Sequence, residues 1–207
     1  MKGAAVAVLG ALAGGIAGAL LALRFALPAP DPAEAYLAAN RAEVERQVLA
    51  DVERYGVDVY RLYLEISQAL PGLPGSDFAV DKAVKKLQVT YPDSHVHRLA
   101  AADVVYGAIR KRDMLQIEQF LEAADRAGDA RLLMSNGYEI VPQLVAAQYN
   151  YLFHTGRFAE AEKTLGYLEA KFGGSYIFQP QGKPIAVAGF IANQRRVLAI
   201  VKRKEAR

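Results

Sequence analysis

Apolar positions recur every three to four residues along most of the chain, the spacing that places them on one face of an α-helix. One such stripe runs from Leu37 to Tyr55 and stops at Gly56, and a second runs from Val59 to Leu70. Two prolines and two glycines in the segment Pro71–Gly75 then interrupt the pattern, because they remove backbone donors and add backbone freedom. We therefore expect a helical segment over residues 33–70, set apart from the rest of the chain.

Beyond this break the same period predicts further helices joined by short turns. Their ranges are 76–90, 94–111, 114–127, 138–154, 158–172 and 185–204, and the one strand candidate is Ser175–Phe178. Ser76 or Asp77, and Asp93 or Ser94, are residue types that cap helix N-termini. Helices with short connections pack as antiparallel neighbours, so residues 76–207 are predicted to form a helical-hairpin bundle or a short solenoid. The expected fold class is all-α.

The first 27 residues are predicted to be a transmembrane anchor. Gly3–Leu23 is a run of 21 residues without a charge, and at ~1.5 Å per residue its helix would span a hydrocarbon core of ~30 Å. The alternative is a cleaved signal peptide, but the one well-formed small-x-small site, Ala17–Ala19, lies inside the run. A proline-rich linker, residues 28–32, separates the anchor from the helical segment.

Charges beside the run predict its orientation, and small residues within it predict a packing face. Lys2 precedes the run while Asp31 and Glu34 come after it, with Arg24 at the boundary as a complication. Basic residues favour the cytoplasmic side, so we expect a single-pass protein of the inner membrane with its bulk in the periplasm. Gly10, Gly14 and Gly18 form a doubled G-x-x-x-G row, which lets another transmembrane helix approach closely.

The segment 142–173 resembles a tetratricopeptide repeat, on the strength of Thr155-Gly156-Arg157-Phe158-Ala159-Glu160-Ala161 and of the Ala161-x-x-x-Leu165 spacing. The resemblance implies a helical hairpin in which Gly156 permits the turn, Phe158 fills the gap between helices and Ala161 sits at their crossing. Tyr149, Leu152 and Gly173 depart from the family pattern. A shift of 44 residues places Arg112, Met114, Ile117 and Leu121 over Gly156, Phe158, Ala161 and Leu165 as a degenerate echo.

The same resemblance implies a groove for a protein or peptide partner. Its residues on the first helix would be Gln143, Ala146, Asn150, Phe153 and His154. The lysine with which some relatives clamp a carboxylate would fall at Ala146, so that mode of recognition is not supported. We expect His154 to interact, as a cation, with the last carbonyls of its helix, and a groove contact is the alternative.

Candidate chemistry is sparse. The chain has no Cys, which excludes disulfides, thiol nucleophiles and Cys-ligated metals, and no nucleotide-binding or hydrolase motif is present. His95 and His97 cannot share a metal on a helix, and we expect them to be solvated there. The alternative is an extended segment, in which Asp93, His95 and His97 would share a face and could hold a metal. Glu65 and Glu139 lie between apolar residues but are expected on solvated faces. No catalytic, cofactor-binding or metal-binding residue is therefore predicted.

The charge balance points to protein partners rather than nucleic acid. Without Lys2 and Arg24 the chain carries 23 basic and 22 acidic residues, which is not the footprint of a nucleic-acid-binding protein. The basic C-terminal helix is expected to close the bundle, and a membrane or partner contact is its alternative. The sequence thus predicts a membrane-anchored interaction protein, an accessory or assembly subunit of a membrane complex. Two alternatives are a membrane-tethered envelope enzyme acting through carboxylates and a non-catalytic subunit contributing to a haem or metal site.

Overall fold

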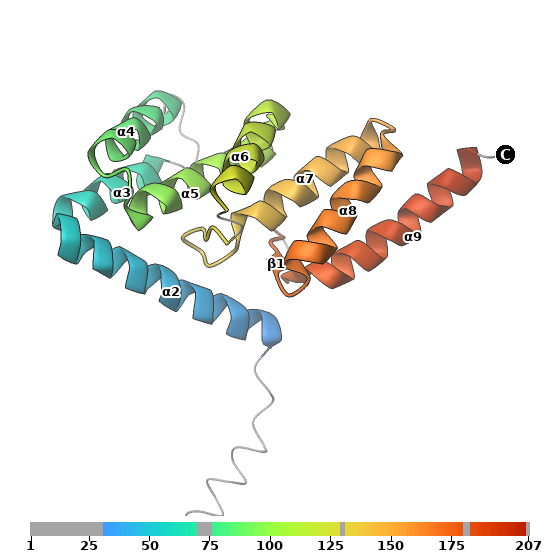
Figure 1. Cartoon of the computed structure of the whole chain (residues 1–207), viewed down its shortest axis with the longest axis horizontal. Helices are drawn as coiled ribbons and strands as arrows, with labels where there is room; N and C mark the ends of the chain where they lie inside the picture. The colour runs from blue at the N-terminus through green and yellow to red at the C-terminus, as the bar shows by residue number, and fades with distance from the viewer. Residues whose placement is uncertain (1–30, 70–75, 129–130, 180–182, 206–207) are drawn as a thin grey trace, which may run out of the picture.

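The computed structural model describes residues 31–69, 76–128, 131–179 and 183–205, and over these ranges the chain is almost entirely α-helical (Figure 1). The helices are α2 (Pro32–Tyr55), α3 (Val57–Ala69), α4 (Ser76–Thr90), α5 (His95–Lys111), α6 (Met114–Ala127), α7 (Ile140–His154), α8 (Phe158–Phe172) and α9 (Val187–Glu205). Two short strands, β1 (Tyr176–Ile177) and β2 (Ile185–Ala186), pair antiparallel. The predicted all-α class is confirmed for these ranges.

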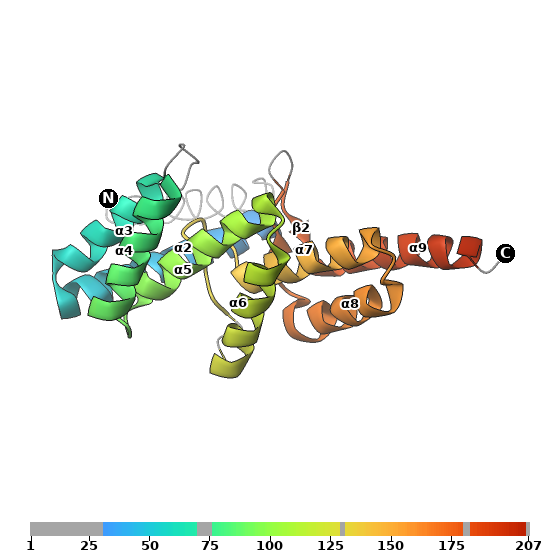
Figure 2. The ribbon, with the colours of Figure 1, turned by 90° about the horizontal axis from the view of Figure 1, so that it is seen from above.

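Consecutive helices form antiparallel hairpins that lie side by side in one row. Figures 1 and 2 show α3–α4, α5–α6 and α7–α8 in sequence along the molecule, with α9 packed against α8 at the end of the row. Helix α2 crosses one side of the row, where it contacts α3 and α5. The arrangement is a stack of helical hairpins, as the short connections predict.

Local sequence explains where several helices begin and turn. Ser94 caps α5, since its hydroxyl accepts a hydrogen bond from the backbone N–H of His97, and the Asp113 carboxylate caps α6 in the same way through Gln116. The α7–α8 turn falls at residues 155–157 as predicted, with Gly156 at φ +75°. Arg112 occupies the equivalent place in the α5–α6 turn, at φ +55°.

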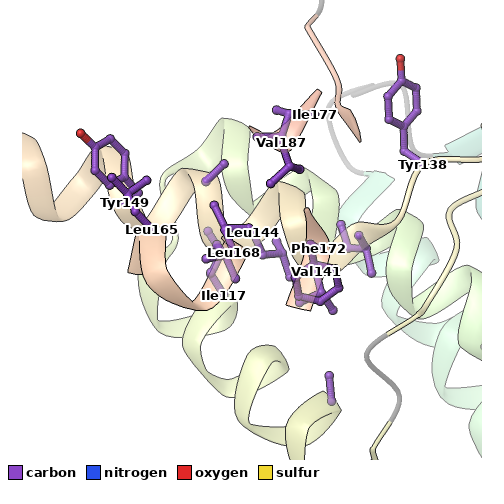
Figure 3. Packing of buried hydrophobic residues seen from close by; sticks show 14 of the residues in the cluster. Ile117, Tyr138, Val141, Leu144, Tyr149, Leu165, Leu168, Phe172, Ile177 and Val187 are labelled. Carbon is purple, nitrogen blue, oxygen red and sulfur yellow. The ribbon is translucent and has the colours of Figure 1, made fainter. Parts of the chain in front are cut away.

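Two apolar clusters hold the row together. One joins α2, α3, α4 and the first half of α5, and the other joins the second half of α5 to α6, α7, α8, β1 and α9. Figure 3 shows the second cluster, in which Ile117, Leu144, Leu165 and Leu168 lie together and are fully buried. Helices α2 and α5 both contribute to the two clusters, α2 through Leu37 and Val44, so these two helices link the two ends of the stack.

Several predicted features lie outside the described residues. The anchor over residues 1–27, with Gly10, Gly14 and Gly18, is one of them, and the Pro71–Gly75 break is another. Within the ranges given above, no helix combines the length and the apolar character needed to cross a membrane. Helix α3 ends at Ala69 and α4 begins at Ser76, on either side of the break.

Candidate functional site

The residues predicted to line a partner groove all lie on α7, but in two different environments. Asn150 and His154 are exposed, and Phe153 is partly buried. Gln143 and Ala146, nearer the start of the helix, are only 4% and 5% exposed. The predicted groove is therefore open only along the second half of α7.

The first half of this helix face is covered by the chain itself. The side-chain amide of Gln143 donates to the carbonyl of Tyr176 over 2.9 Å, and its oxygen accepts from the backbone N–H of Phe178 over 2.8 Å. The Gln143 side chain thus binds one backbone carbonyl and one backbone N–H of the extended segment that carries β1. The sequence predicted that Gln143 would contact a partner, and in the structure it contacts this chain instead. The physical reason is that a buried amide must satisfy its hydrogen bonds, and the neighbouring strand supplies the partners.

We use the term α7 face for the stripe that contains Gln143, Asn150 and His154. Seven residues separate Gln143 from Asn150, close to two helical turns, so both side chains leave the helix in nearly the same direction. The stripe is therefore continuous. Its beginning holds an extended segment of this chain, and its end, at Asn150 and His154, is uncovered.

The α7–α8 hairpin that presents this face is packed with apolar side chains. Ala161 is fully buried between α7 and α8, and the ring of Phe158 lies edge-on to that of Phe153, with centroids 5.6 Å apart. Tyr149 stands where the family favours a small residue. It is fully buried, and α9 accommodates it by placing Phe190 edge-on at 5.8 Å. The family assignment itself remains a proposal.

Thr155, not His154, satisfies the last carbonyls of α7. The Thr155 hydroxyl donates to the carbonyls of Tyr151 and Leu152 at 2.9 and 3.2 Å. The ring of His154 instead lies edge-on against Phe153. Because the threonine hydroxyl reaches these carbonyls from its own backbone position, the histidine is left exposed on the α7 face.

Glu139 corrects another prediction, since it is buried rather than solvated. Only 5% of it is exposed, and its carboxylate accepts hydrogen bonds from Arg131 Nε at 3.1 Å and from the hydroxyl of Ser175. Arg131 also donates to the side chain of Asn40 on α2. Burial and the Glu139 charge raise the pKa of Tyr36, which lies beside this cluster. The cluster ties α2, the loop before α7 and the segment before β1 together.

A second acid, the partly buried Asp103 of α5, holds the same loop from the other side. Its carboxylate accepts from the Tyr63 hydroxyl and from the Ser135 backbone N–H, both at 3.0 Å. Burial raises the pKa of Asp103 and that of the Tyr63 hydroxyl. Asp51 on α2, which is 3% exposed, accepts from the Val96 N–H at the start of α5. These carboxylates are committed to backbone and tyrosine partners, which is a structural role.

The remaining candidates for chemistry lie apart from these clusters. His95 and His97 sit in the first turn of α5, as predicted, where one contacts Arg98 and the other the Pro92 carbonyl. Glu65 is exposed, as expected. No group of three or more His, Asp or Glu side chains suited to a metal ion occurs among the residues placed by the structure.

A second open surface lies on the other side of α7, between α6 and α8. It is a groove of about 450 Å³ whose lining combines acidic residues from α6, a basic residue from α8 and an apolar base; the lining residues are Glu118, Leu121, Glu122, Asp125, Val145, Gln148, Lys163, Thr164 and Tyr167. A smaller pocket of about 180 Å³ continues it toward Val141 and Lys171. We refer to the larger of the two, the groove of about 450 Å³, as the α6–α8 groove. Its α7 residues lie on the side of that helix opposite the α7 face.

Sequence reasoning missed both the buried polar cluster and the α6–α8 groove. The cluster joins residues from Asn40 to Ser175, and no local spacing relates them. The groove had one sequence signal, the carboxylates Glu118, Glu122 and Asp125 at helical spacing on α6. Comparison with known proteins adds no relative: no family model matches the chain, and no curated protein or solved structure shows significant similarity to it.

Proposed function

We propose that this chain is a membrane-anchored helical interaction protein, an accessory or assembly subunit of a membrane complex. In this proposal the α7 face holds an extended segment of the partner. The observation that supports it is the pair of hydrogen bonds between the Gln143 amide and the backbone of residues 176 and 178. The chain itself thereby provides an example of extended backbone held on this face.

Asn150 offers the same chemistry two helical turns further along. Its amide is exposed, and an amide can donate to one backbone group and accept from another. Phe153 and His154 flank it with aromatic rings that pack edge-on at 5.6 Å. A partner segment that continues along the α7 face beyond β1 would meet these three side chains.

The anchor completes the proposal, although it lies outside the described residues. The uncharged run Gly3–Leu23 would place the helical stack at the membrane surface, on the periplasmic side, and Gly10, Gly14 and Gly18 would pack against a transmembrane helix of the same complex. Two contacts of modest strength on one partner reinforce each other, because the second contact becomes intramolecular.

Affinity purification from gently solubilised membranes tests the proposal. Asn150→Ala should reduce recovery of the co-purifying partner by roughly three- to tenfold, the effect of losing about 1 kcal/mol of hydrogen bonding. Gln88→Ala is the matched control, since Gln88 is an exposed amide on α4. Gly14→Ile should lower recovery while leaving the protein in the membrane fraction.

Three results would contradict the proposal. A mature N-terminus anywhere from Leu20 to Asp31, measured by mass spectrometry, would remove the anchor. Equal recovery with Asn150→Ala and Gln88→Ala would remove the α7 face as the binding surface. Unchanged recovery with Gly14→Ile would assign the glycine row to composition alone.

A further inference from the structure

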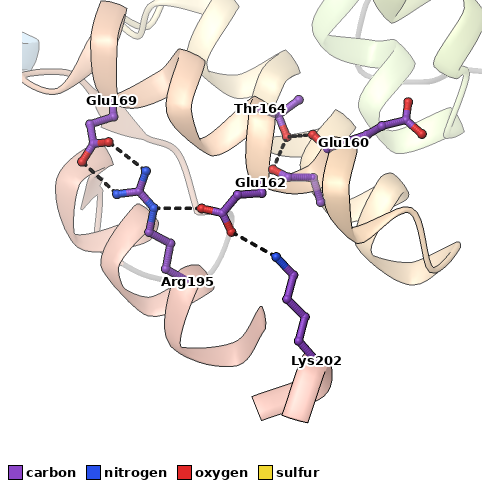
Figure 4. A network of polar contacts seen from close by, with 7 residues as sticks. Glu160, Glu162, Thr164, Glu169, Arg195 and Lys202 are labelled. Atoms are coloured by element: carbon purple, nitrogen blue, oxygen red, sulfur yellow. Dashed lines mark hydrogen bonds and ion pairs between the residues drawn. The ribbon is translucent and has the colours of Figure 1, made fainter. Parts of the chain in front are cut away.

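Helix α9 docks on α8 through two cations that meet two carboxylates at the same spacing (Figure 4). Arg195 donates to Glu169 at 2.8 and 2.9 Å and to Glu162 at 3.3 Å, and Lys202 lies 3.8 Å from Glu162. Arg195 and Lys202 are seven residues apart, and so are Glu162 and Glu169. Seven residues advance a helix by ~10.5 Å, so the two pairs match along their helix axes.

An exposed stripe of α9, about 100° around the helix from Arg195 and Lys202, repeats the basic half of this pattern. Arg196 and Arg203 are again seven residues apart, and both are exposed. Neither has a carboxylate within 4 Å among the described residues. Small residues lie beside them on the exposed surface, namely Gly189, Ala192 and Ala199. This side of α9 therefore allows another helix to approach closely and meet two cations.

Helix α6 repeats the acidic half of this pattern of paired charges. Glu118 and Asp125 are seven residues apart with Glu122 between them, and all three are exposed along one wall of the α6–α8 groove. In the part of the chain that the structure places, none of the three carboxylates forms an ion pair within 4 Å. Arg126 donates to the backbone carbonyl of Glu122 at 3.2 Å, and Arg157 interacts with Glu118 at longer range. Lys163 is on the opposite wall, so the acidic character belongs to the α6 side of the groove.

We propose that α9 of one copy of this chain lies against α6 of a second copy, with Arg196 and Arg203 facing Glu118, Glu122 and Asp125. The contact joins two different surfaces, so it is head-to-tail, and it leaves one free α6 and one free α9 at the ends of every open assembly. Such contacts extend into longer oligomers or close into rings. The inference concerns contacts between copies and is independent of the partner on the α7 face.

Charge complementarity selects a second copy over a lipid surface as the occupant. A helix that lies in a membrane interface needs large apolar side chains beside its basic residues. On the described part of α9, Ile200 is the one exposed large apolar residue, at 57%. Its neighbours on the open side are alanine, glycine and asparagine, which suit a close helix–helix contact.

Mixing two neutralised full-length variants in mild detergent provides the test. Glu118→Gln/Glu122→Gln/Asp125→Asn removes the acidic surface, and Arg196→Gln/Arg203→Gln removes the basic one. By light scattering, the wild-type protein should form concentration-dependent oligomers that dissociate when salt rises from about 50 to 500 mM, because salt screens exposed ion pairs. Each variant alone should weaken association at least tenfold, and a mixture should form a one-to-one dimer that grows no further.

Cysteine cross-linking locates the contact by proximity, and Glu122→Cys leaves the charges of Glu118 and Asp125 in place. The chain has no Cys of its own, so Glu122→Cys mixed with Ala199→Cys can give only disulfides at the chosen positions. We expect a cross-linked heterodimer from this pair and at least fivefold less from Glu122→Cys mixed with Glu45→Cys, whose cysteine lies on the exposed side of α2. Far-UV circular dichroism checks that every variant keeps its helix content.

The outcomes separate this contact from the other surfaces. Wild-type protein that stays monomeric, or neutralised variants that associate as strongly as wild type, would overturn the proposal. Association through the apolar run Gly3–Leu23 would persist in both variants. Binding to anionic vesicles that depends on Arg196 and Arg203, without self-association, would assign the basic surface to the membrane instead.

Discussion

The side-chain amide of Asn40 donates a 2.8 Å hydrogen bond to the carbonyl of Gly137, a residue 97 positions away. This bond fixes α2 against the loop that leads into α7, at a place where the two backbones nearly touch. A Cβ on Gly137 would lie 2.9 Å from the Leu37 carbonyl oxygen and from Cγ of Arg41. The close approach explains why glycine is required at this point.

Gly137→Ala should therefore destabilise the protein strongly. The residue has φ +87° and would meet backbone atoms, so the left-handed conformation and the overpacking add to about 2–4 kcal/mol. Urea unfolding monitored by circular dichroism measures it. Gly128→Ala is the control, because Gly128 has φ +71° but open space around it, and it should cost only about 1 kcal/mol.

Arg112→Gly should stabilise the protein, in contrast to Gly137→Ala. Arg112 holds φ +55° at the α5–α6 turn, and a left-handed conformation costs a non-glycine residue about 1–2 kcal/mol. Glycine removes that cost but loses more entropy on folding, which leaves a net gain of about 0.5–1 kcal/mol. A lower unfolding midpoint for Arg112→Gly than for wild type would show that the guanidinium makes contacts worth more than the strain.

Ala161→Leu should overpack the α7–α8 crossing at a cost of about 1–3 kcal/mol, because Ala161 has no exposed surface. Asn150→Ala should change stability by less than about 0.5 kcal/mol, as expected of an exposed side chain. Thermal or urea unfolding of both variants is the measurement. A harmless Ala161 change with a damaging Asn150 change would reverse the assignment of the two sides of the hairpin.

The pH dependence of stability should report on Asp103. Its pKa is raised by burial above the ordinary value of 3.8, so the folded chain binds this proton more tightly than the unfolded chain does. Folding then takes up a proton in the window above pH 3.8, and the contribution of Asp103 to stability falls as pH rises through that window. Above that pH window, the contribution of Asp103 to stability stays at its lower value.

Asp103→Asn isolates this effect. Asparagine keeps an acceptor oxygen for the Ser135 N–H, and its NH2 group can donate to the Tyr63 hydroxyl oxygen instead of accepting from it, but it does not titrate. Relative to this variant, wild type should become more stable as pH is lowered from 7 toward 4, in urea unfolding at a series of pH values. A stability difference that is constant with pH would mean that Asp103 has the same pKa in the folded and unfolded chains.

The sequence by itself determined the local structure of the described ranges. Helical periodicity is a local signal, and α6 and α8 begin and end where it predicted. Capping residues, such as Ser94 at α5 and Asp113 at α6, are local signals as well. The α7–α8 turn could be placed from Gly156 and its neighbours for the same reason. The α5–α6 turn likewise lies between the helices predicted over 94–111 and 114–127, and Arg112 takes the positive φ there.

Tertiary structure decided which polar residues are buried and which surfaces stay open. Glu139 looked like a solvated acid because its buried partners, Arg131 and Ser175, are reached only through folding of the loop and of the segment before β1. Gln143 looked like a groove residue because nothing local shows that β1 returns to cover it. Helix period specifies which side chains share a face, but the segments that pack on that face depend on contacts between distant parts of the chain, which no local pattern encodes.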